Sequence, residues 1–380
     1  MKPLYLDNAA TTRVDKKVVK EMENYFLENF GNPSSLHELG EKAKNAINDA
    51  RKILCLEINA KPWEIYFTSS GTEANNLAIQ GLARASQKKK KIIISEIEHP
   101  SVLEPCKFLQ SQGFQLIKIP VNHEGLINMQ FLKKQLEKNS KEILLVSVMQ
   151  VNNIIGTLQD IEKIGILCNQ FNVLFHTDAV QSFGKLNIDV KKFNISLLSA
   201  SAHKINGPKG TGFLYISEKI KISPLIFGGG QEKDLRSGTE NVPAIIGFAK
   251  ALELYKKINK NKILKLRSTL ITKLEKIGGK INGSKENRIF NNIHVSFPNY
   301  QNLESDYLVT FLSQRKIYVS AGSACDSNKE KEDHVLKAIG LNSKEAKSSI
   351  RITINENLKE KDVDYVIREI KKALRIFKSP

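Results

Sequence analysis

A lysine beside a histidine has the clearest chemistry in this sequence. Lys204 follows a predicted apolar strand over residues 195–199, stands next to His203 and precedes a turn rich in Gly and Pro at residues 207–210. A solvated surface lysine explains this setting poorly. Burial and neighbouring positive charge lower the pKa of a lysine and make its amine nucleophilic. The segment therefore meets the requirements of a lysine that forms a Schiff base.

Asp178 is a second candidate, because it stands at the end of an apolar run over residues 173–178. Ligands of open α/β sheets collect beyond the carboxyl ends of the strands. A carboxylate at this place could bind a metal, act as a base or pair with the charged ring nitrogen of a cofactor. It could equally cap the turn that follows. The residues alone leave these alternatives open.

The segment over residues 65–76 changes directly from an apolar strand into a helix through Ser, Gly and Thr. Backbone N–H groups and hydroxyls at the start of a helix suit an anion such as phosphate. Ser and Thr also cap helices for purely structural reasons, so phosphate binding and simple capping both fit this segment. The Walker pattern GxxxxGK[ST] is absent, and residues 207–212 do not match GxGxxG.

The four cysteines form no CxxC pair and no zinc-binding spacing, so no metal site is expected. Cys55, Cys106 and Cys168 lie in apolar helical patterns and are predicted to be buried, inert thiols, which fits a reducing cytoplasm. Cys325 lies instead among small and polar residues at 321–328. Such a stretch is too polar to pack in a core, and its small residues would let a loop move. We therefore expect a reactive thiol at Cys325.

Seven apolar runs and the helical patterns between them predict the elements that position these residues. Short continuous apolar strands that alternate with helices indicate a largely parallel sheet covered on both faces. The predicted strands cover residues 65–68, 92–95, 115–119, 143–147, 173–178, 195–199 and 212–216. The predicted helices among them cover residues 73–85, 101–112, 128–136 and 161–171.

After Pro243 the pattern changes to that of a smaller α+β domain. A long lysine-rich helical stretch over residues 244–277 is predicted to lead into this part of the chain. Its predicted elements are strands at 293–297, 317–319 and 350–354 and a last helix at 361–377. The sequence therefore predicts one large α/β domain and one small domain.

The composition is that of an ordinary globular protein, with 41% hydrophobic and 26% charged residues among 380. These values exclude a disordered, collagen-like or disulfide-dense chain. The net charge of +18 raises the question of nucleic acid, but only 10 of the 58 basic residues are Arg, the residue that specific readers of phosphate favour. No direct nucleic-acid binding is therefore expected.

No export signal and no run of about 18 apolar residues is present, so a cytoplasmic protein without membrane contact is expected.

Nine segments together resemble the cysteine desulfurases, a branch of the class V aminotransferase family of pyridoxal phosphate enzymes. They occur in the family's order and at its spacing from residue 4 to the last helix. The segments are residues 5–12, 31–35, 98–99, 151–153, 178–181, 228–232, 236–239, 322–325 and 348–351. The sequence departs from the family at Ile154, where an acid is usual, and at Gln150, where His is common.

The resemblance implies fold type I of these enzymes, an α/β fold with a mainly parallel seven-stranded sheet in the large domain. The large cofactor domain is expected over residues 16–255, and the smaller α+β domain over residues 1–15 and 256–380. The cofactor is pyridoxal 5'-phosphate and the substrate L-cysteine. A homodimer is expected, because Thr239 of one subunit would reach a phosphate in the other.

The resemblance also implies a role for each site residue. Lys204 would form the Schiff base and move the Cα proton, Asp178 would pair with the pyridinium nitrogen, and His99 would stack on the ring. The remaining cofactor and substrate contacts fall into three groups: Gly71, Thr72, Ser201 and His203 for the phosphate, Asn153 and Gln181 for the phenolic oxygen of the ring, and Asn32 and Arg351 for the α-carboxylate of the substrate.

Cys325 would take the sulfur as a persulfide and leave alanine. The sulfur would then pass to an acceptor protein, such as an iron–sulfur scaffold or a factor for tRNA thiolation. Three other functions compete with this one: a selenocysteine lyase or another class V enzyme, a binding protein without turnover, and a basic nucleic-acid binder. Lys204 and Cys325 occurring together argue against the binding protein.

Overall fold

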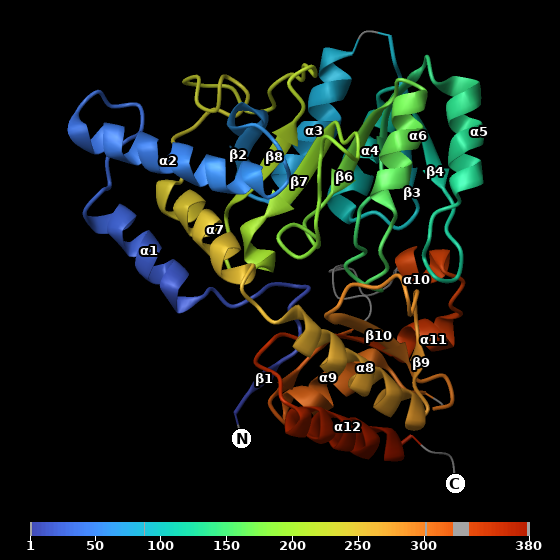
Figure 1. Ribbon diagram of the computed structural model, residues 1–380. Coiled ribbons are helices and arrows are strands. Elements are labelled where there is room, and N and C mark those ends of the chain that lie inside the picture. Colours follow the sequence, from blue (N-terminus) through green and yellow to red (C-terminus); the bar gives the residue numbers. More distant parts are fainter. Residues whose placement is uncertain (1, 87, 301, 322–333, 378–380) are drawn as a thin grey trace.

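The computed structural model describes residues 2–86, 88–300, 302–321 and 334–377. Two bodies of secondary structure lie against each other, and the smaller body contains both the first strand and the last helix (Figure 1). The larger body is built around one sheet. The smaller body is built around a second sheet, with the long helices of the C-terminal part packed against it.

The larger sheet has seven strands in the order β2-β8-β7-β6-β5-β3-β4. Only β8 runs against the others, since β7 and β2 both pair with it antiparallel and the remaining pairs are parallel. The strands are β2 (Ile65–Thr68), β3 (Lys91–Ser95), β4 (Gln115–Ile119), β5 (Ile143–Ser147), β6 (Leu174–Asp178), β7 (Leu197–Ser201) and β8 (Gly212–Ile216).

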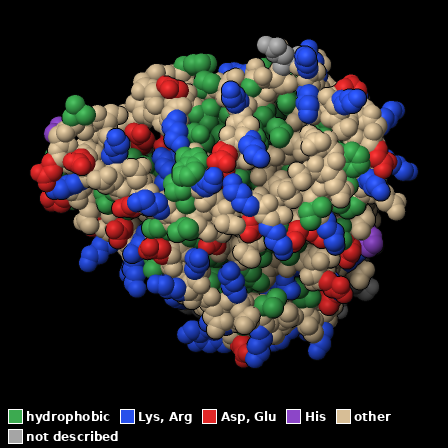
Figure 2. Space-filling view, turned by 45° about the horizontal axis from the view of Figure 1, so that its top comes forward, with side chains coloured by type: hydrophobic (Ala, Val, Ile, Leu, Met, Phe, Trp, Pro, Cys, Tyr) green, Lys and Arg blue, Asp and Glu red, His purple; other side chains and the backbone are tan. Residues whose placement is uncertain are grey.

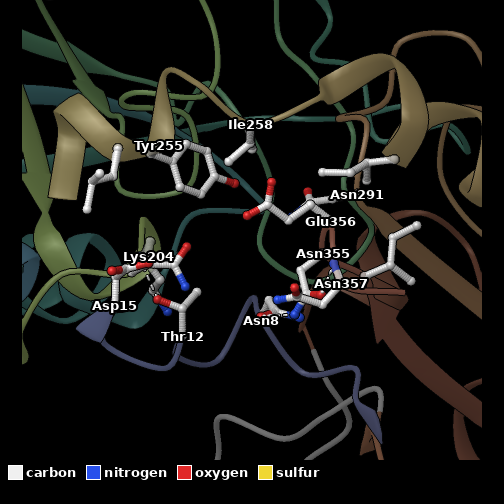
Figure 3. A pocket seen from close by; sticks show the side chains of 14 residues that line it. Asn8, Thr12, Asp15, Lys204, Tyr255, Ile258, Asn291, Asn355, Glu356 and Asn357 are labelled. Atoms are coloured by element: carbon white, nitrogen blue, oxygen red, sulfur yellow. Dashed lines mark hydrogen bonds between the residues drawn. The ribbon is translucent and has the colours of Figure 1, made fainter. Parts of the chain in front are cut away.

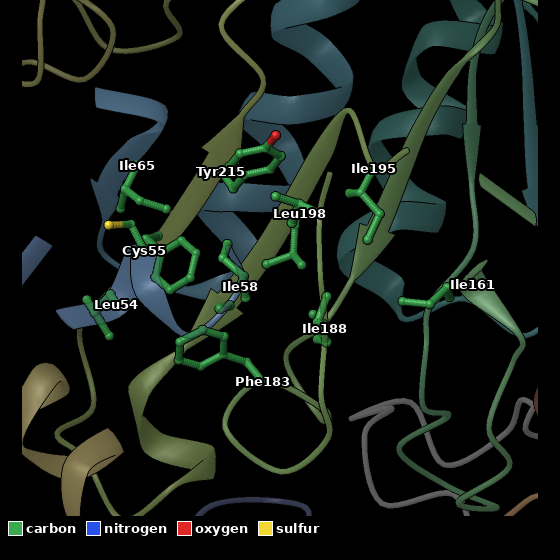
Figure 4. Packing of buried hydrophobic residues seen from close by; sticks show 14 of the residues in the cluster. Leu54, Cys55, Ile58, Ile65, Ile161, Phe183, Ile188, Ile195, Leu198 and Tyr215 are labelled. Atoms are coloured by element: carbon green, nitrogen blue, oxygen red, sulfur yellow. The ribbon is translucent and has the colours of Figure 1, made fainter. Parts of the chain in front are cut away.

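Successive side chains of a strand point to opposite sides of the sheet, so the continuous apolar strands make both faces apolar. Helices cover both faces. On β3, Ile93 packs into the core under α2, α5, α6 and α7, whereas Ile92 and Ile94 pack under α3 and α4. Figure 4 shows part of the first of these cores. The helices of the larger body are α1 (Lys16–Leu27), α2 (Glu38–Leu56), α3 (Gly71–Ala85), α4 (Pro100–Ser111), α5 (Met129–Asn139), α6 (Ile161–Gln170) and α7 (Val242–Tyr255), with short 3-10 turns η1 (Pro62–Glu64) and η2 (Ala202–Lys204).

The smaller body joins segments from the two ends of the sequence. Its four-stranded sheet has the order β12-β13-β10-β9, and β1 pairs in parallel with β11 beside it. The strands are β1 (Leu4–Tyr5), β9 (Lys280–Ile281), β10 (Asn292–Ser296), β11 (Ile317–Tyr318), β12 (Ser320–Ala321) and β13 (Ser349–Thr353). The helices are α8 (Lys260–Lys276), α9 (Ser305–Ser313), α10 (His334–Ala338), α11 (Ser343–Lys347) and α12 (Glu360–Arg375).

The predicted fold class and the seven predicted strands of the large sheet are confirmed. The limits of one strand and the extent of one helix are corrected. The strand predicted at 195–199 is Leu197–Ser201, because its pairing with β8 extends to the small residues Ser201 and Gly212. The single helix predicted over 244–277 is wrong. It is two helices, α7 and α8, because the lysine-rich stretch between them has no apolar stripe and Asn259 caps the second helix by accepting from the N–H of Lys262.

Within the described ranges, no helix combines the length and the apolar character needed to cross a bilayer.

An aromatic cluster beneath the turn that follows β6 gives a test of the packing. Phe183 is buried, with its ring edge-on to Phe213 at 5.0 Å and to Phe248 at 5.7 Å (Phe183 is labelled in Figure 4). Phe183→Ala should lower the free energy of unfolding by about 3–5 kcal/mol, because it leaves a cavity that the neighbouring rings cannot fill. Phe108→Ala, at an exposed ring on α4, should change it by about 0.5 kcal/mol or less. Urea unfolding measures both, and equal losses would contradict this packing.

Candidate active site

A cavity of about 280 Å³ lies where β6 and β7 end and α3 begins. This is the edge of the sheet at which ligands of open α/β folds collect. Nine of the predicted residues line it: Gly71, Thr72, His99, Asn153, Asp178, Gln181, Ser201, His203 and Lys204. Six further lining residues were not predicted: Ala9, Ala10, Ser70, Ser101, Met149 and Val180.

Lys204 lies at the end of η2, directly after β7. Its Nζ donates to the carbonyl oxygens of Ala9 at 2.6 Å and Ala10 at 2.7 Å, so the N-terminal segment forms one wall of the cavity. Burial, reinforced by the nearby charge of Lys204, lowers the pKa of Lys185 to about 7 and that of His203 to about 3. The half-buried amine of Lys204 therefore lies close to a second lysine, Lys185, within the range of their mutual repulsion.

Asp178 is tied to His99 by two side chains that the sequence analysis did not assign. The two amide hydrogens of Asn75 go to Asp178 Oδ2 and to Ser101 Oγ, each at 2.8 Å. The Ser101 hydroxyl lies 2.8 Å from His99 Nδ1, which also accepts from the Ser101 N–H. The other oxygen of Asp178 accepts from the N–H of Val180, so the carboxylate does cap the following turn. A role as a cap and a role toward a cofactor are therefore compatible.

The start of α3 forms a cradle for an anion. Ser70 caps the helix by accepting from the N–H of Glu73. A Cβ on Gly71 would come within 2.4 Å of Val180 Cγ2, so only glycine allows the backbone this close approach. Ser201 and His203 lie on the same side of the cavity, and the Nδ1 of His203 lies 3.1 Å from the Thr11 hydroxyl. If Nδ1 accepts from Thr11, the proton of the neutral ring lies on Nε2, which can donate to a phosphate.

The donor set fits pyridoxal phosphate. A helix N-terminus with hydroxyl groups suits its phosphate, a carboxylate suits a protonated ring nitrogen, and a lysine amine lines the same cavity. The amide of Gln181 donates to the carbonyl oxygen of Ala9 at 2.9 Å, beside Lys204. The roles of the individual residues stay predictions.

Three predicted residues do not line this cavity. Asn32 and Thr239 are exposed, and the side-chain oxygen of Asn32 accepts from the N–H of Ser34. Arg351 is buried behind the cavity wall, where its Nη1 donates to the main-chain oxygen of Asn153 at 3.0 Å. The predicted thiol of Cys325 lies outside the described residues.

Glu98 is a buried acid beside the site to which the sequence analysis gave no role. Its Oε1 accepts from the Ser95 hydroxyl and the Met149 N–H, while Oε2 has no partner among the residues that the structure describes. Burial raises the pKa of this carboxyl to about 8.

The structure also explains why Ile154 stands where the family usually has an acid. Its side chain packs with Ile97 and the apolar residues of α10, in surroundings that suit an apolar residue.

A second, smaller cavity of about 100 Å³ lies between the two bodies, and Lys204 and Thr12 belong to its wall. Figure 3 shows the hydroxyl of Tyr255 directed toward the carboxylate of Glu356 across it. The segment from Asn8 to Thr12 thus separates two hollows, and Lys204 reaches both.

The family profile Aminotransferase class-V matches residues 4–366. The chain is 44% identical to the cysteine desulfurase IscS of Methanosarcina thermophila, over 97% of this chain and 91% of that protein. It is 43% identical to the cysteine desulfurase IscS of Clostridium botulinum, over 98% and 95%. A solved NifS-like protein superposes with a TM-score of 0.90 at 37% identity, over 99% and 100% of the chains. SspA in complex with cysteine superposes with a TM-score of 0.83 at 38% identity, over 93% and 99%. These likenesses confirm the fold type expected from the sequence.

The link through Asn75 predicts an effect on cofactor affinity. Asn75→Ala removes the donor to Asp178 Oδ2 and to Ser101 Oγ, so the affinity of the protein for pyridoxal phosphate should fall about tenfold. Asn76→Ala is the matched control, because the neighbouring Asn76 bonds only to Thr72 and Gln80 of its own helix. Titration of cofactor-free protein, followed by absorbance, measures both. Equal affinities of the two variants would contradict a role for this link.

The raised pKa of Glu98 predicts a pH-dependent stability. Between its ordinary value of 4.5 and its folded value of about 8, the folded state binds more protons than the unfolded state, so this group lowers stability as pH rises through that window. Glu98→Gln removes the titration and keeps an acceptor for Ser95 and Met149. The free energy of unfolding of the variant relative to wild type should therefore increase from pH 5 to pH 8.5. A constant difference would mean that Glu98 titrates normally.

Proposed function

The chain belongs to the class V aminotransferase family, and from this we propose that it is a pyridoxal-phosphate-dependent cysteine desulfurase that converts L-cysteine to L-alanine. The observation that carries the proposal is the cavity in which Lys204, Asp178 and His99 meet beside the start of α3. The near full-length likeness to two cysteine desulfurases supports it.

Bound pyridoxal phosphate supplies an electron sink that stabilises negative charge on the Cα atom of an amino acid. The residues of the chain provide the rest. The carboxylate of Asp178 holds a proton on the ring nitrogen, and Asn75 keeps that carboxylate fixed through its Oδ2. The Nζ of Lys204 takes the proton from Cα. The side chain of His99, which lines the same cavity, would keep water from the bound cofactor.

Cys325 is proposed to take the sulfur. Its thiolate attacks the sulfur of the substrate, a sulfur–sulfur bond forms, and the bond between Cβ and sulfur breaks. The electron pair of that bond remains with the carbon, which gains a proton, so that alanine leaves and Cys325 carries the persulfide. The sequence around this residue, small and polar, supports the step.

We propose that residues 16–255 form the cofactor domain and that residues 1–15 and 256–380 form the small domain. The pairing of β1 with β11 supports this division.

We also propose a homodimer. Large apolar side chains are exposed where α1 ends and α2 approaches, and Thr239 is exposed away from the cavity of its own chain, as a residue that serves a second copy would be. The exposed apolar residues in this region are Phe26, Leu27, Phe30 and Leu36.

The sulfur is proposed to pass to an acceptor protein for iron–sulfur cluster assembly or thio-modification. On the face that Figure 2 shows, Lys and Arg side chains are dispersed among Asp and Glu. This distribution is typical of a mixed solvated surface, not of a stripe that follows nucleic acid.

We also propose a cytoplasmic location. Cys55, Cys106 and Cys168 are free thiols, as is usual in a reducing compartment.

The proposal predicts a clean separation of cofactor binding from sulfur release. Cys325→Ala should keep the absorbance of the bound cofactor, because Lys204 is unchanged, yet release sulfide from L-cysteine about a hundredfold more slowly or less. Cys55→Ala removes a thiol that is buried far from the cavity and serves as the control. Sulfide and alanine are measured together in the presence of a reductant.

Release at the wild-type rate by Cys325→Ala would overturn the role of this thiol. A strong preference for L-selenocysteine over L-cysteine in the same assay would instead assign the protein to the selenocysteine lyases.

A further inference from the structure

Arg351 is held by a closed set of hydrogen bonds in the smaller body. Its Nη2 donates to Asp7 Oδ1 and to Ser320 Oγ, both at 2.9 Å, and the Ser320 hydroxyl donates to the same Asp7 oxygen at 2.6 Å. Its Nη1 donates to the carbonyl oxygen of Asn153. The guanidinium is buried, with 2% of the side chain exposed, and Asp7 is the acid that forms an ion pair with it.

These contacts place Asp7 and Ser320 on Nη2 of Arg351, the nitrogen that a bidentate carboxylate needs. A guanidinium binds a carboxylate bidentately through Nε with Nη2 or through Nη1 with Nη2. Asp7 Oδ1 and Ser320 Oγ both accept from Nη2, so a ligand that uses either pair shares this nitrogen with them. The Nε has no acceptor among residues 2–86, 88–300, 302–321 and 334–377. A bidentate ligand must therefore compete with Asp7 and Ser320 for Nη2.

Asp7 cannot withdraw far from Arg351, because the backbone around it is bonded to the strand that carries the arginine. The Thr353 N–H donates to the Leu6 oxygen, and the Asn8 side chain donates to the Thr353 oxygen at 2.6 Å. The Ala9 N–H donates to the hydroxyl of the same threonine at 3.2 Å. Asp7 and Arg351 thus belong to one rigid unit, and a substrate carboxylate that reaches the guanidinium meets the Asp7 carboxylate beside it.

We propose that Asp7 is an internal competitor for the guanidinium of Arg351 and thereby sets the affinity of the site for the α-carboxylate of an amino acid. The substrate carboxylate takes the place of Asp7 on Nη2, and the remaining negative charge of Asp7 opposes it. Asp7 is on this account a specificity-determining residue and takes no part in the chemical step. The inference rests on the proposed function in one point, the role of Arg351 toward the substrate carboxylate, which the family resemblance implies.

The test compares two ligands on the protein loaded with its cofactor. L-alanine has the carboxylate, whereas L-alanine amide lacks it, and neither undergoes sulfur chemistry. Isothermal titration calorimetry gives the dissociation constant of each. In Asp7→Asn the ratio of affinities, alanine over the amide, should rise about tenfold, because a like charge beside the carboxylate is lost while an acceptor for Nη2 remains.

Asp7→Glu keeps a carboxylate and should keep the wild-type ratio, and Arg351→Gln should bring the ratio close to one. A fall of the ratio in Asp7→Asn would mean that Asp7 only orients Arg351, and the proposal would be wrong. The same gain in Asp7→Glu would attribute the effect to lost packing and would also overturn it. An unchanged ratio in Arg351→Gln would remove the carboxylate from this arginine.

The outcome is independent of desulfuration. Wild-type protein that releases no sulfur from L-cysteine would contradict the proposed function, while the alanine measurements would still decide the role of Asp7.

Discussion

The N-terminal segment from Leu4 to Thr12 is the constraint on which both ends of the site depend. Its first residues pair with β11, and the carboxylate of Asp7 binds the guanidinium of Arg351 in the smaller body. A few residues later, the carbonyl oxygens of Ala9 and Ala10 accept from the amine of Lys204 in the larger body. One short segment, which turns at residues 8–10, therefore contacts both the group expected to hold the substrate carboxylate and the group expected to move its Cα proton. Helices and strands elsewhere serve to hold this stretch in place.

A second constraint on the cavity is that its buried polar groups need hydrogen-bond partners. The charge of Asp178 is satisfied by Asn75 and by the N–H of Val180, and Asn75 passes the contact on through Ser101 to His99. Each group is thus held in one orientation before any ligand arrives, which lowers the cost of ordering the site. Glu98 differs, since one of its oxygens has no partner in the described part of the chain and burial raises its pKa. An acid in that state is neutral near neutral pH and leaves Asp178 as the negative charge facing the cavity.

Local sequence patterns were sufficient for the large sheet, because continuous apolar strands bounded by turn residues give a strong signal. They failed at β7, which extends to Ser201 through its pairing with the distant β8. They also missed the helix break near Asn259, where the local signal is a single capping side chain inside a lysine-rich stretch. Lys204, Asp178 and the start of α3 lie at strand ends and a helix start, so residue types indicated them as candidates. His99, Asn153 and Gln181 were expected only from the family resemblance. One feature of the sequence could have indicated a role for Asn75, because it places an amide on the apolar face of α3. Its hydrogen-bond partners, however, come from β6 and α4. The contact between Asp7 and Arg351 joins residues 344 positions apart, which no local pattern encodes.

The most direct test of the central claim, that this cavity removes sulfur from cysteine and delivers it to a thiol of the chain, is a single turnover without reductant. The protein with its cofactor is mixed with one equivalent of L-cysteine, alanine is quantified, and the peptide that contains Cys325 is weighed by mass spectrometry. The account predicts alanine in equal amount to a gain of one sulfur atom on that peptide. Formation of pyruvate in place of alanine, or alanine without added sulfur on Cys325, would contradict it.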